Sequence, residues 1–244
     1  MRCPFSVFTV LLAILSLLSS SQAVLSSVDQ QAATDAHNTY RAMEGASNML
    51  QMSWDPYLAS VAQAYAQQCI FSHNSARSTQ YTAAAGTNAV ASYVGENLYV
   101  TSGGDTPGLV GSAIQAWYSE KSGYNLTTNS CSGVCGHYTQ IVWAQSYLVG
   151  CGSSYCQSVS GFNSAGTIIV CDYAPGGNYV GQVPYTRGTT CSACPAQWPY
   201  CYNNALCSKT PTQTQAPGSV TASSASNSAK HILLMIAVLL SIII

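Results

Sequence analysis

Charged residues are scarce in this sequence: 7 Lys and Arg and 8 Asp and Glu among 244 residues, or 6%, with a formal net charge of −1. A chain with so little positive charge has no basic surface to hold a phosphate backbone, so nucleic-acid binding is disfavoured. The hydrolase signatures GxSxG and HExxH are absent as well. Solubility must come from hydroxyl and amide side chains and from any attached glycan.

The N-terminal segment has the pattern of a secretory signal peptide. Arg2 precedes an apolar core at residues 5–18, and Ser21-Gln22-Ala23 forms a small-x-small cleavage site. The alternative, a membrane anchor, is disfavoured because the apolar run is too short to span a bilayer. We therefore predict a signal peptide at residues 1–23.

The C-terminal segment ends in the apolar run ILLMIAVLLSIII, at residues 232–244. As a helix it would reach roughly 20 Å, against roughly 30 Å of hydrocarbon. A polar spacer with small triplets such as Ser223-Ser224-Ala225 precedes it. This pattern predicts a GPI-anchor signal whose tail, residues 231–244, is removed, and hence attachment to a membrane through lipid. A tail-anchored helix is the alternative.

The cysteine count indicates an oxidising compartment. Of eleven cysteines, Cys3 would leave with the signal peptide, and the remaining ten suggest five disulfides in a secreted chain. The sequence also contains one glycosylation sequon, Asn125-Leu126-Thr127, which would place that loop at the surface.

Helical patterns come first along the chain and strand patterns later. We predict a helix from about Ser27 to Met43, a second helix capped by Asp55 with Pro56 at its first position, and a third from Leu109 to near Gly123. Residues 72–92 are polar and small and indicate a loop, and residues 95–100 indicate a turn entering a short element.

Three runs after His137 are rich in β-forming residues, namely 139–145, 146–152 and 166–174. These runs predict a small antiparallel sheet, and the whole pattern predicts an α+β sandwich joined by disulfides.

Four cysteines lie within 17 residues near the end of the domain, at Cys191, Cys194, Cys201 and Cys207. This segment, residues 188–207, is too small for a core of its own and indicates a two-disulfide knot. Its CxxC spacing also allows a zinc or redox site, which an oxidising compartment disfavours. Residues 208–230, rich in Ser, Thr and Pro, indicate a stalk.

Two motifs stand out, GHYTQIVWAQS at residues 136–146 and IIVCDYAPGGNY at residues 168–179. They resemble the two signatures of the CAP superfamily, which comprises cysteine-rich secretory, antigen 5 and pathogenesis-related 1 proteins. Asp172 departs from the second signature, in which relatives usually carry Asn or another neutral or basic residue. Further matches follow in family order at 37–41, 50–54, 95–99, 117–125 and 177–185.

The resemblance implies a CAP domain at residues 24–187, similar to the fungal and plant PR-1-like secreted proteins. Its fold would be an α-β-α sandwich with a central antiparallel sheet. The knot is similar to a hinge found in some members, which implies the pairs Cys191–Cys201 and Cys194–Cys207. The other six cysteines allow 15 pairings, and the sequence does not choose among them.

The resemblance also implies a cleft that holds two histidines and two acids. Carried over by position, these are His37 and His137 with Glu96 and Glu120. Two imidazoles are fewer than the three protein ligands of a usual catalytic zinc site, so weak Zn²⁺ binding is expected. We interpret His73 as structural and outside the cleft.

A second implied site is the loop at residues 117–133, which binds sterols in some relatives. Trp117, Tyr118 and Tyr124 are its candidate lipid-binding residues. The alternative is that Trp117 and Tyr118 complete the buried face of the third helix. We thus expect a secreted, GPI-anchored protein at a cell surface or wall that binds a sterol or related lipid and is not an enzyme. A metal-dependent hydrolase or peptidase and an extracellular recognition or defence protein are the alternatives.

Overall fold

The computed structural model describes residues 25–211 of the chain. The predicted signal peptide, the anchor signal and nearly all of the predicted stalk lie outside the described residues. Within residues 25–211, no helix combines the length and the hydropathy that a membrane crossing requires.

Three predicted helices are present, each where the sequence places its N-terminal signal. Helix α2 covers Ser27–Ala42, and the Ser26 hydroxyl accepts a hydrogen bond of 3.1 Å from the Asp29 amide. Helix α3 covers Pro56–Ala66 and is capped by Asp55, whose carboxylate accepts from the Leu58 amide at 2.8 Å. These side-chain caps satisfy amides that a helix leaves free in its first turn. Helix α5 covers Leu109–Ser119 and continues as the 3₁₀ turn η2, Glu120–Gly123.

Two other helices correct the sequence prediction. Residues predicted as a loop contain helix α4, Arg77–Ala85, followed by the 3₁₀ turn η1, Gly86–Asn88. The run predicted as a strand after His137 begins with helix α6, Gly136–Ile141. Residues 138–141 of α6 are all buried, so tertiary contacts surround this short helix and remove the apolar periodicity by which a helix is recognised.

The central sheet has four strands in the order β1-β5-β6-β2. Their bounds are Ser53–Trp54 for β1, Leu148–Val159 for β5, Ser164–Ala174 for β6 and Gly95–Thr101 for β2. The pairs β5–β6 and β6–β2 are antiparallel, as predicted, but the short edge strand β1 is parallel to β5. The sheet is therefore mixed. Two small hairpins complete the fold: β3, Tyr124–Asn125, with β4, Ser130–Cys131, and β7, Tyr200–Tyr202, with β8, Leu206–Ser208.

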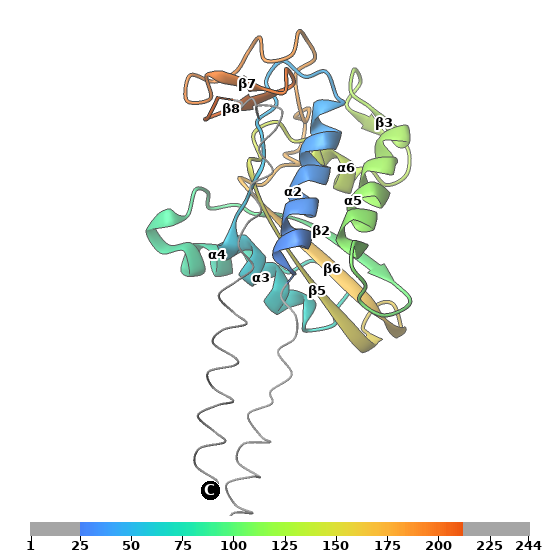
Figure 1. Ribbon diagram of the computed structural model, residues 1–244. Coiled ribbons are helices and arrows are strands. Elements are labelled where there is room, and N and C mark those ends of the chain that lie inside the picture. Colours follow the sequence, from blue (N-terminus) through green and yellow to red (C-terminus); the bar gives the residue numbers. More distant parts are fainter. Residues whose placement is uncertain (1–24, 212–244) are drawn as a thin grey trace, which may run out of the picture. The chain divides into compact units, whose positions relative to one another are not determined.

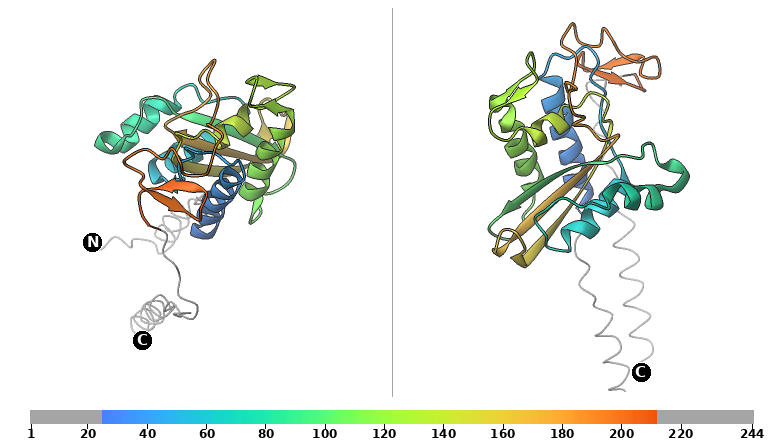
Figure 2. Two further views of the ribbon diagram at one scale, coloured as in Figure 1. Left: turned by 90° about the horizontal axis from the view of Figure 1, so that it is seen from above. Right: turned by 180° about the vertical axis from the view of Figure 1, so that it is seen from behind.

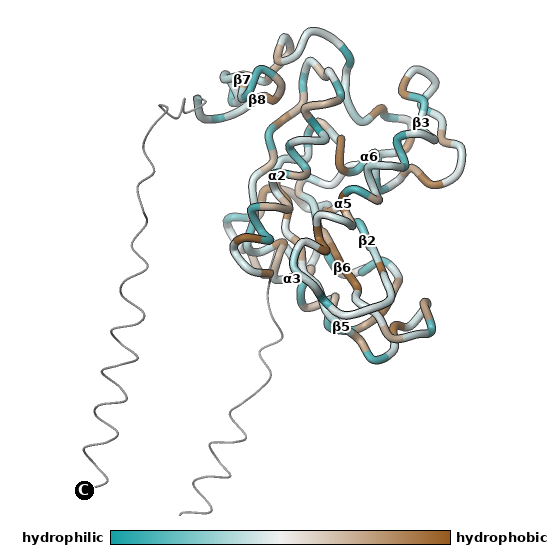
Figure 3. Tube along the Cα trace, turned by 45° about the vertical axis from the view of Figure 1, so that its right-hand side comes forward, coloured by the Kyte–Doolittle hydropathy of each residue, from teal (hydrophilic) through white to brown (hydrophobic). Residues whose placement is uncertain are grey.

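Alternate residues of β6 face two different helical layers, which confirms the α+β sandwich. Ile169 and Tyr173 pack with α2, α5 and α6, whereas Ile168 and Val170 pack with α3. Side chains of a strand point alternately to its two faces, so both faces of β6 are apolar where both are covered. Figures 1 and 2 show α2 and α5 side by side, and Figure 3 shows the apolar character of β6.

Two glycines of β5 let α3 approach the sheet closely. A Cβ atom at Gly150 would clash with the backbone nitrogen of Ala59, and one at Gly152 would clash with the backbone of Gln63. Gln63 also donates to the Ser153 carbonyl at 2.8 Å and accepts from the Ser153 amide. The backbone of α3 therefore lies directly on β5.

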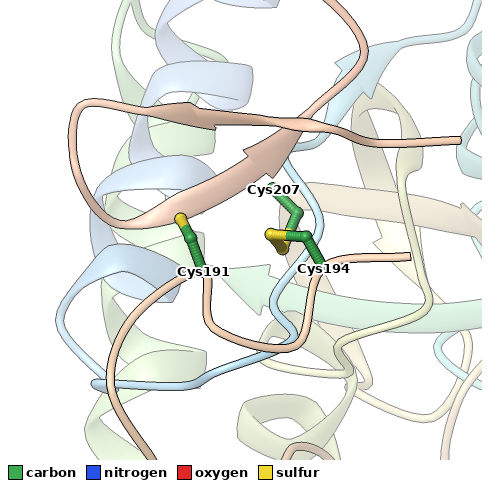
Figure 4. Close-up of side chains that lie close together, drawn as sticks. All are labelled: Cys191, Cys194 and Cys207. Carbon is green, nitrogen blue, oxygen red and sulfur yellow. A yellow bond between two sulfur atoms is a disulfide. The ribbon is translucent and has the colours of Figure 1, made fainter. Parts of the chain in front are cut away.

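Five disulfides are present among the described residues: Cys69–Cys156, Cys131–Cys135, Cys151–Cys171, Cys191–Cys201 and Cys194–Cys207. Both pairs implied for the knot are among them. Figure 4 shows the side chains of Cys191, Cys194 and Cys207. Their sulfur atoms lie within 4.8 Å of one another. Because all three are disulfide-bonded, they offer no thiolate for a zinc ion, and the alternative zinc interpretation of this segment is wrong.

The knot is attached to the domain by backbone and side-chain contacts. The Cys207 amide donates to the Met49 carbonyl at 2.7 Å. The Lys209 ammonium lies over the rings of Tyr147 and Trp198, at 4.9 and 4.7 Å from their centroids. These contacts place the β7–β8 hairpin near the C-terminal end of α2, at the top of Figure 1.

Arg41 joins two loops inside the domain. Its guanidinium is fully buried. It donates hydrogen bonds of 2.6 to 3.1 Å to five carbonyl oxygens, those of Leu50, Ile141, Trp143, Ala144 and Ser146. The segment before β1 and the segment after α6 are thus held by one side chain.

Candidate functional site

His37 lies inside the domain and not in a cleft, so its assignment as a metal ligand is wrong. The residue is 0% exposed. Its Nδ1 lies 2.8 Å from the Ala33 carbonyl oxygen and its Nε2 lies 2.9 Å from the Tyr173 hydroxyl. Since a carbonyl only accepts, Nδ1 carries the proton and Nε2 accepts from Tyr173. Burial lowers the pKa of His37 to about 4, so the ring is neutral at physiological pH.

His73, which the sequence interpretation set aside as structural, forms the first histidine–carboxylate pair. Its Nδ1 lies 2.8 Å from Oε1 of Glu96, and the Asn74 amide donates to the same oxygen at 2.9 Å. The Glu96 side chain is buried, whereas the His73 side chain is 60% exposed. The imidazole is therefore held on its inner side and open to solvent on the other.

His137 forms the second histidine–carboxylate pair, with Glu120. The sequence interpretation placed both residues in the same cleft. The Nδ1 atom of His137 lies 2.6 Å from Oε1 of Glu120. The other carboxylate oxygen accepts from the amides of His137 and Tyr138, at 3.1 and 3.2 Å, in the first turn of α6. A carboxylate at a helix N-terminus is stabilised by these free amides and by the helix dipole. Glu120 thus fixes both the ring and the backbone of His137.

Strand β2 connects the two pairs. Glu96 contacts His73 on one face of the strand, and the next residue, Asn97, points to the other face. The Asn97 amide donates to the His137 carbonyl at 3.1 Å and to the Tyr173 hydroxyl at 3.2 Å. Tyr173 in turn donates to His37. His37 is therefore connected to the second pair by a chain of hydrogen bonds through Tyr173 and Asn97.

His73, which is exposed, and His137, which is partly buried, both have the geometry of metal-binding residues. In each, Nδ1 is paired with a carboxylate, which fixes the ring and leaves Nε2 as the nitrogen available to a ligand. Within the described part of the chain, the three disulfide-bonded cysteines form the only group of three or more potential ligand atoms that lie close together. The histidines alone would thus supply fewer than three ligands, which fits a weak, exchangeable site.

Two of the three predicted lipid-binding residues make packing contacts within the domain. Trp117 is 2% exposed, and its Nε1 donates to the Leu98 carbonyl at 3.0 Å. Tyr118 stacks on Tyr40, with 4.1 Å between ring centroids, and donates to Glu44 at 2.7 Å. The burial of Trp117 contradicts its assignment to an exposed groove, whereas Tyr118 is only partly buried and its lipid-binding role stays a prediction.

Tyr124, the third predicted residue, does line a cavity. The cavity has a volume of about 350 Å³ and is open to solvent beside the β3–β4 hairpin. Its lining consists of Tyr124, Asn129, Cys131, Cys135, Gly136, Thr139, Trp143, Asn178, Tyr179, Gly181, Gln182 and Pro184. Aromatic rings and amides dominate this set, and it contains no charged side chain. The second signature motif, which ends at Tyr179, contributes to this lining, which the sequence interpretation did not foresee.

Asn125 is exposed and is the last residue of β3, directly before the turn to β4. Its side-chain oxygen accepts from the amides of Thr127 and Thr128, at 3.0 and 3.3 Å. These bonds form a local turn that leaves the side chain at the surface. Glycosylation of Asn125 stays a prediction.

Comparison with known sequences gives one consistent result. A sequence model of the cysteine-rich secretory protein family, CAP, matches residues 34–173. Peptidase inhibitor 16 from Bos taurus is 41% identical over 189 residues, which cover 75% of this chain and 37% of that protein. GLIPR1-like protein 1 from Bos taurus is 46% identical over 162 residues, covering 66% and 63%. Peptidase inhibitor R3HDML from Mus musculus is 35% identical over 198 residues, covering 75% and 73%. The chain thus spans little more than a third of the first relative and under two thirds of the second.

Solved structures show the same fold. NaASP2 with Zn²⁺ is 25% identical, with a TM-score of 0.54, and the match covers 69% of this chain and 90% of that one. Venom allergen-like protein 4 from Schistosoma mansoni is 25% identical, with a TM-score of 0.52 and coverages of 67% and 97%.

Proposed function

Because the chain belongs to the CAP family of cysteine-rich secretory proteins, we propose that it is an extracellular binding protein whose ligand is a sterol or related lipid. The observation that carries this proposal is the cavity beside the β3–β4 hairpin. Its volume of about 350 Å³ falls within the usual range of small-molecule sites.

The chemistry of the lining favours a flat, largely apolar ligand with a single polar end. Tyr124, Trp143 and Tyr179 present aromatic surface, and Asn129 and Gln182 offer amides that can bind one hydroxyl group. A sterol that buries about 200 Å² of apolar surface here would gain roughly 5 kcal/mol, from which the cost of association must be subtracted. An affinity in the micromolar range is the expected outcome.

Binding of radiolabelled cholesterol to the purified secreted protein tests this proposal. We expect Tyr124→Ala and Tyr179→Ala each to weaken binding about tenfold, because each removes one face of the cavity. Tyr155→Ala is the matched control, since Tyr155 is 41% exposed on β5 and does not line the cavity. Equal cholesterol binding by the wild type and the three variants would show that the cavity is not the binding site.

A second candidate function is weak binding of a divalent cation, which the two histidine–carboxylate pairs favour. His73 and His137 would hold the ion through Nε2, while Glu96 and Glu120 fix the rings through Nδ1. A bound Zn²⁺ would act as a Lewis acid. The relative solved as NaASP2 with Zn²⁺ supports this second candidate.

Calorimetric titration with Zn²⁺ separates the two histidine assignments. We expect His73→Ala and His137→Ala each to weaken Zn²⁺ binding at least tenfold, whereas His37→Gln leaves it unchanged. Loss of binding in folded His37→Gln, together with full binding in His73→Ala, would contradict the assignment.

We also propose that a GPI anchor holds the protein at the cell surface, from the sequence pattern of residues 208–244. Treatment of intact cells with a phosphatidylinositol-specific phospholipase C should release the protein into the medium. Retention on cells in which a known GPI-anchored protein is released would refute the anchor.

A further inference from the structure

Two buried acids next to the first histidine, Glu96 and Asp172, have three carboxylate oxygens without a hydrogen-bond donor. Among the described residues, four buried side-chain atoms have no hydrogen-bond partner, and three of them are Oε2 of Glu96 and both carboxylate oxygens of Asp172. An unpaired buried polar atom costs stability, so natural proteins rarely keep three together. By contrast Glu44, another buried acid, accepts from three tyrosine hydroxyls and pairs with Lys121.

The two acids are direct neighbours across the sheet. Glu96 on β2 is the register partner of Asp172 on β6. Directly opposed residues of antiparallel strands lie on the same face with Cβ atoms roughly 4.5–5.5 Å apart, so the two carboxyl groups can reach each other.

The other neighbours of Asp172 do not supply a hydrogen-bond partner for its carboxyl group. On the opposite side its register partner is Gly150, which has no side chain and is covered by the backbone of α3. Asp172 itself is 0% exposed. The nearby cation, Arg77 on α4, donates to the carbonyls of Val94 and Asn74 at 2.7 and 2.8 Å. Glu96 is therefore the polar group with which Asp172 can pair.

The surroundings determine which acid keeps a proton. Burial, and then the charge of Glu96, raise the pKa of Asp172 well above its usual value, and the charge of Arg77 opposes them only in part. A protonated carboxyl group has one O–H donor, and Oε2 of Glu96 is an acceptor without a donor. A protonated Asp172 thus has the O–H donor that Oε2 of Glu96 lacks, and Glu96 is the acceptor for that donor.

We propose that Asp172 is a positioning residue that stays protonated at neutral pH and donates a hydrogen bond to Oε2 of Glu96. Oε1 of Glu96 is then held in place to accept from His73 and from the Asn74 amide. The hydrogen bond itself does not depend on the proposed cation. Its consequence for ion binding does, because that step rests on His73 being a ligand.

Infrared spectroscopy of the whole secreted protein in heavy water at pH 7 tests the protonation state. We expect the stretching band of a protonated carboxylic acid, absent from Asp172→Asn and retained in Asp35→Asn, whose carboxylate accepts from Gln31 near the surface of α2. Absence of the band at pH 7, or its survival in Asp172→Asn, would overturn the proposal.

The His73 ring gives a readout that a purely structural role would leave unchanged. We expect the Nδ1 proton of His73, followed by NMR, to exchange with water at a similar rate in wild type and Asp172→Asn, because the amide also donates to Glu96. In Asp172→Leu the donor is gone, and exchange should be at least tenfold faster. An unchanged rate in folded Asp172→Leu would refute positioning. If that variant does not fold, the infrared comparison decides.

Discussion

Replacement of Arg41 by Met should be the most damaging single change in the core. The buried guanidinium serves five carbonyl oxygens. Two of these oxygens also accept a backbone amide, at Trp143 and Ala144, which leaves three without a donor after the change. Each carbonyl left without a donor costs about 1–3 kcal/mol, and part of this cost is offset because the variant no longer buries a charge. We therefore expect the free energy of unfolding to decrease by about 4 kcal/mol. This is a large part of the usual free energy of unfolding.

Thermal and urea unfolding under non-reducing conditions would measure the effect of Arg41→Met. For a domain of this size, a loss of about 4 kcal/mol lowers Tm by roughly 8–16 °C. Arg187→Met is the matched control, because Arg187 is exposed and the same change there should alter stability by less than about 0.5 kcal/mol. A loss below about 1 kcal/mol in Arg41→Met would show that water or other donors satisfy these carbonyls and that our reasoning about this side chain is wrong.

Three further changes test other parts of the fold. The neutral His37 ring contributes its full stabilisation above its unfolded pKa of 6.5, and this contribution is lost as the pH falls toward the folded pKa of about 4. Between pH 7 and pH 4, the free energy of unfolding of wild type, measured with urea, should therefore fall by about 3 kcal/mol more than that of His37→Gln. Equal decreases in the two proteins would contradict a buried neutral ring. Lys209→Met removes a cation that lies over two aromatic rings, so proteolysis of the knot should be faster while Tm changes by only a few degrees, and an unchanged cleavage rate would argue against this contact. Gly95→Ala places a methyl group against the side chain of Gln140, which is held by hydrogen bonds to the Gly177 amide and to Ser146. The free energy of unfolding should therefore decrease by about 1–3 kcal/mol. An unchanged free energy of unfolding would show that Gln140 can move.

Much of the fold could be predicted because its signals are local. Asp55 and Pro56 mark the start of α3 by hydrogen bonding and a fixed backbone angle, and the structure uses both. Helix α6 could not be recognised, because residues 138–141 are all buried and three of them, Tyr138, Thr139 and Ile141, carry β-forming side chains. The direction of β1 could not be predicted either, since a strand of two residues has no pattern that sets its orientation.

The site was harder to predict than the fold, and the two histidines show why. His37 shares its helix face with Ala33 and Arg41, at a spacing of four residues, and all three are buried. That spacing is the signal that could have placed His37 in the core. His73 lies in a polar loop without periodicity, and only the three-dimensional position of Glu96 shows its role. Trp117 likewise follows the apolar face of α5, and its burial follows from that face.

Strand β2 makes the two histidines dependent on a single short stretch of backbone. Because Glu96 and Asn97 are consecutive, inserting or deleting one residue ahead of them would turn the carboxylate toward α6 and the amide toward α3. The His73 imidazole would lose its carboxylate partner and the His137 carbonyl would lose its amide donor in the same event. The loop that carries His73 and the helix α6 that carries His137 can therefore vary independently over evolutionary time, whereas the length of this stretch cannot change without disturbing contacts of both histidines.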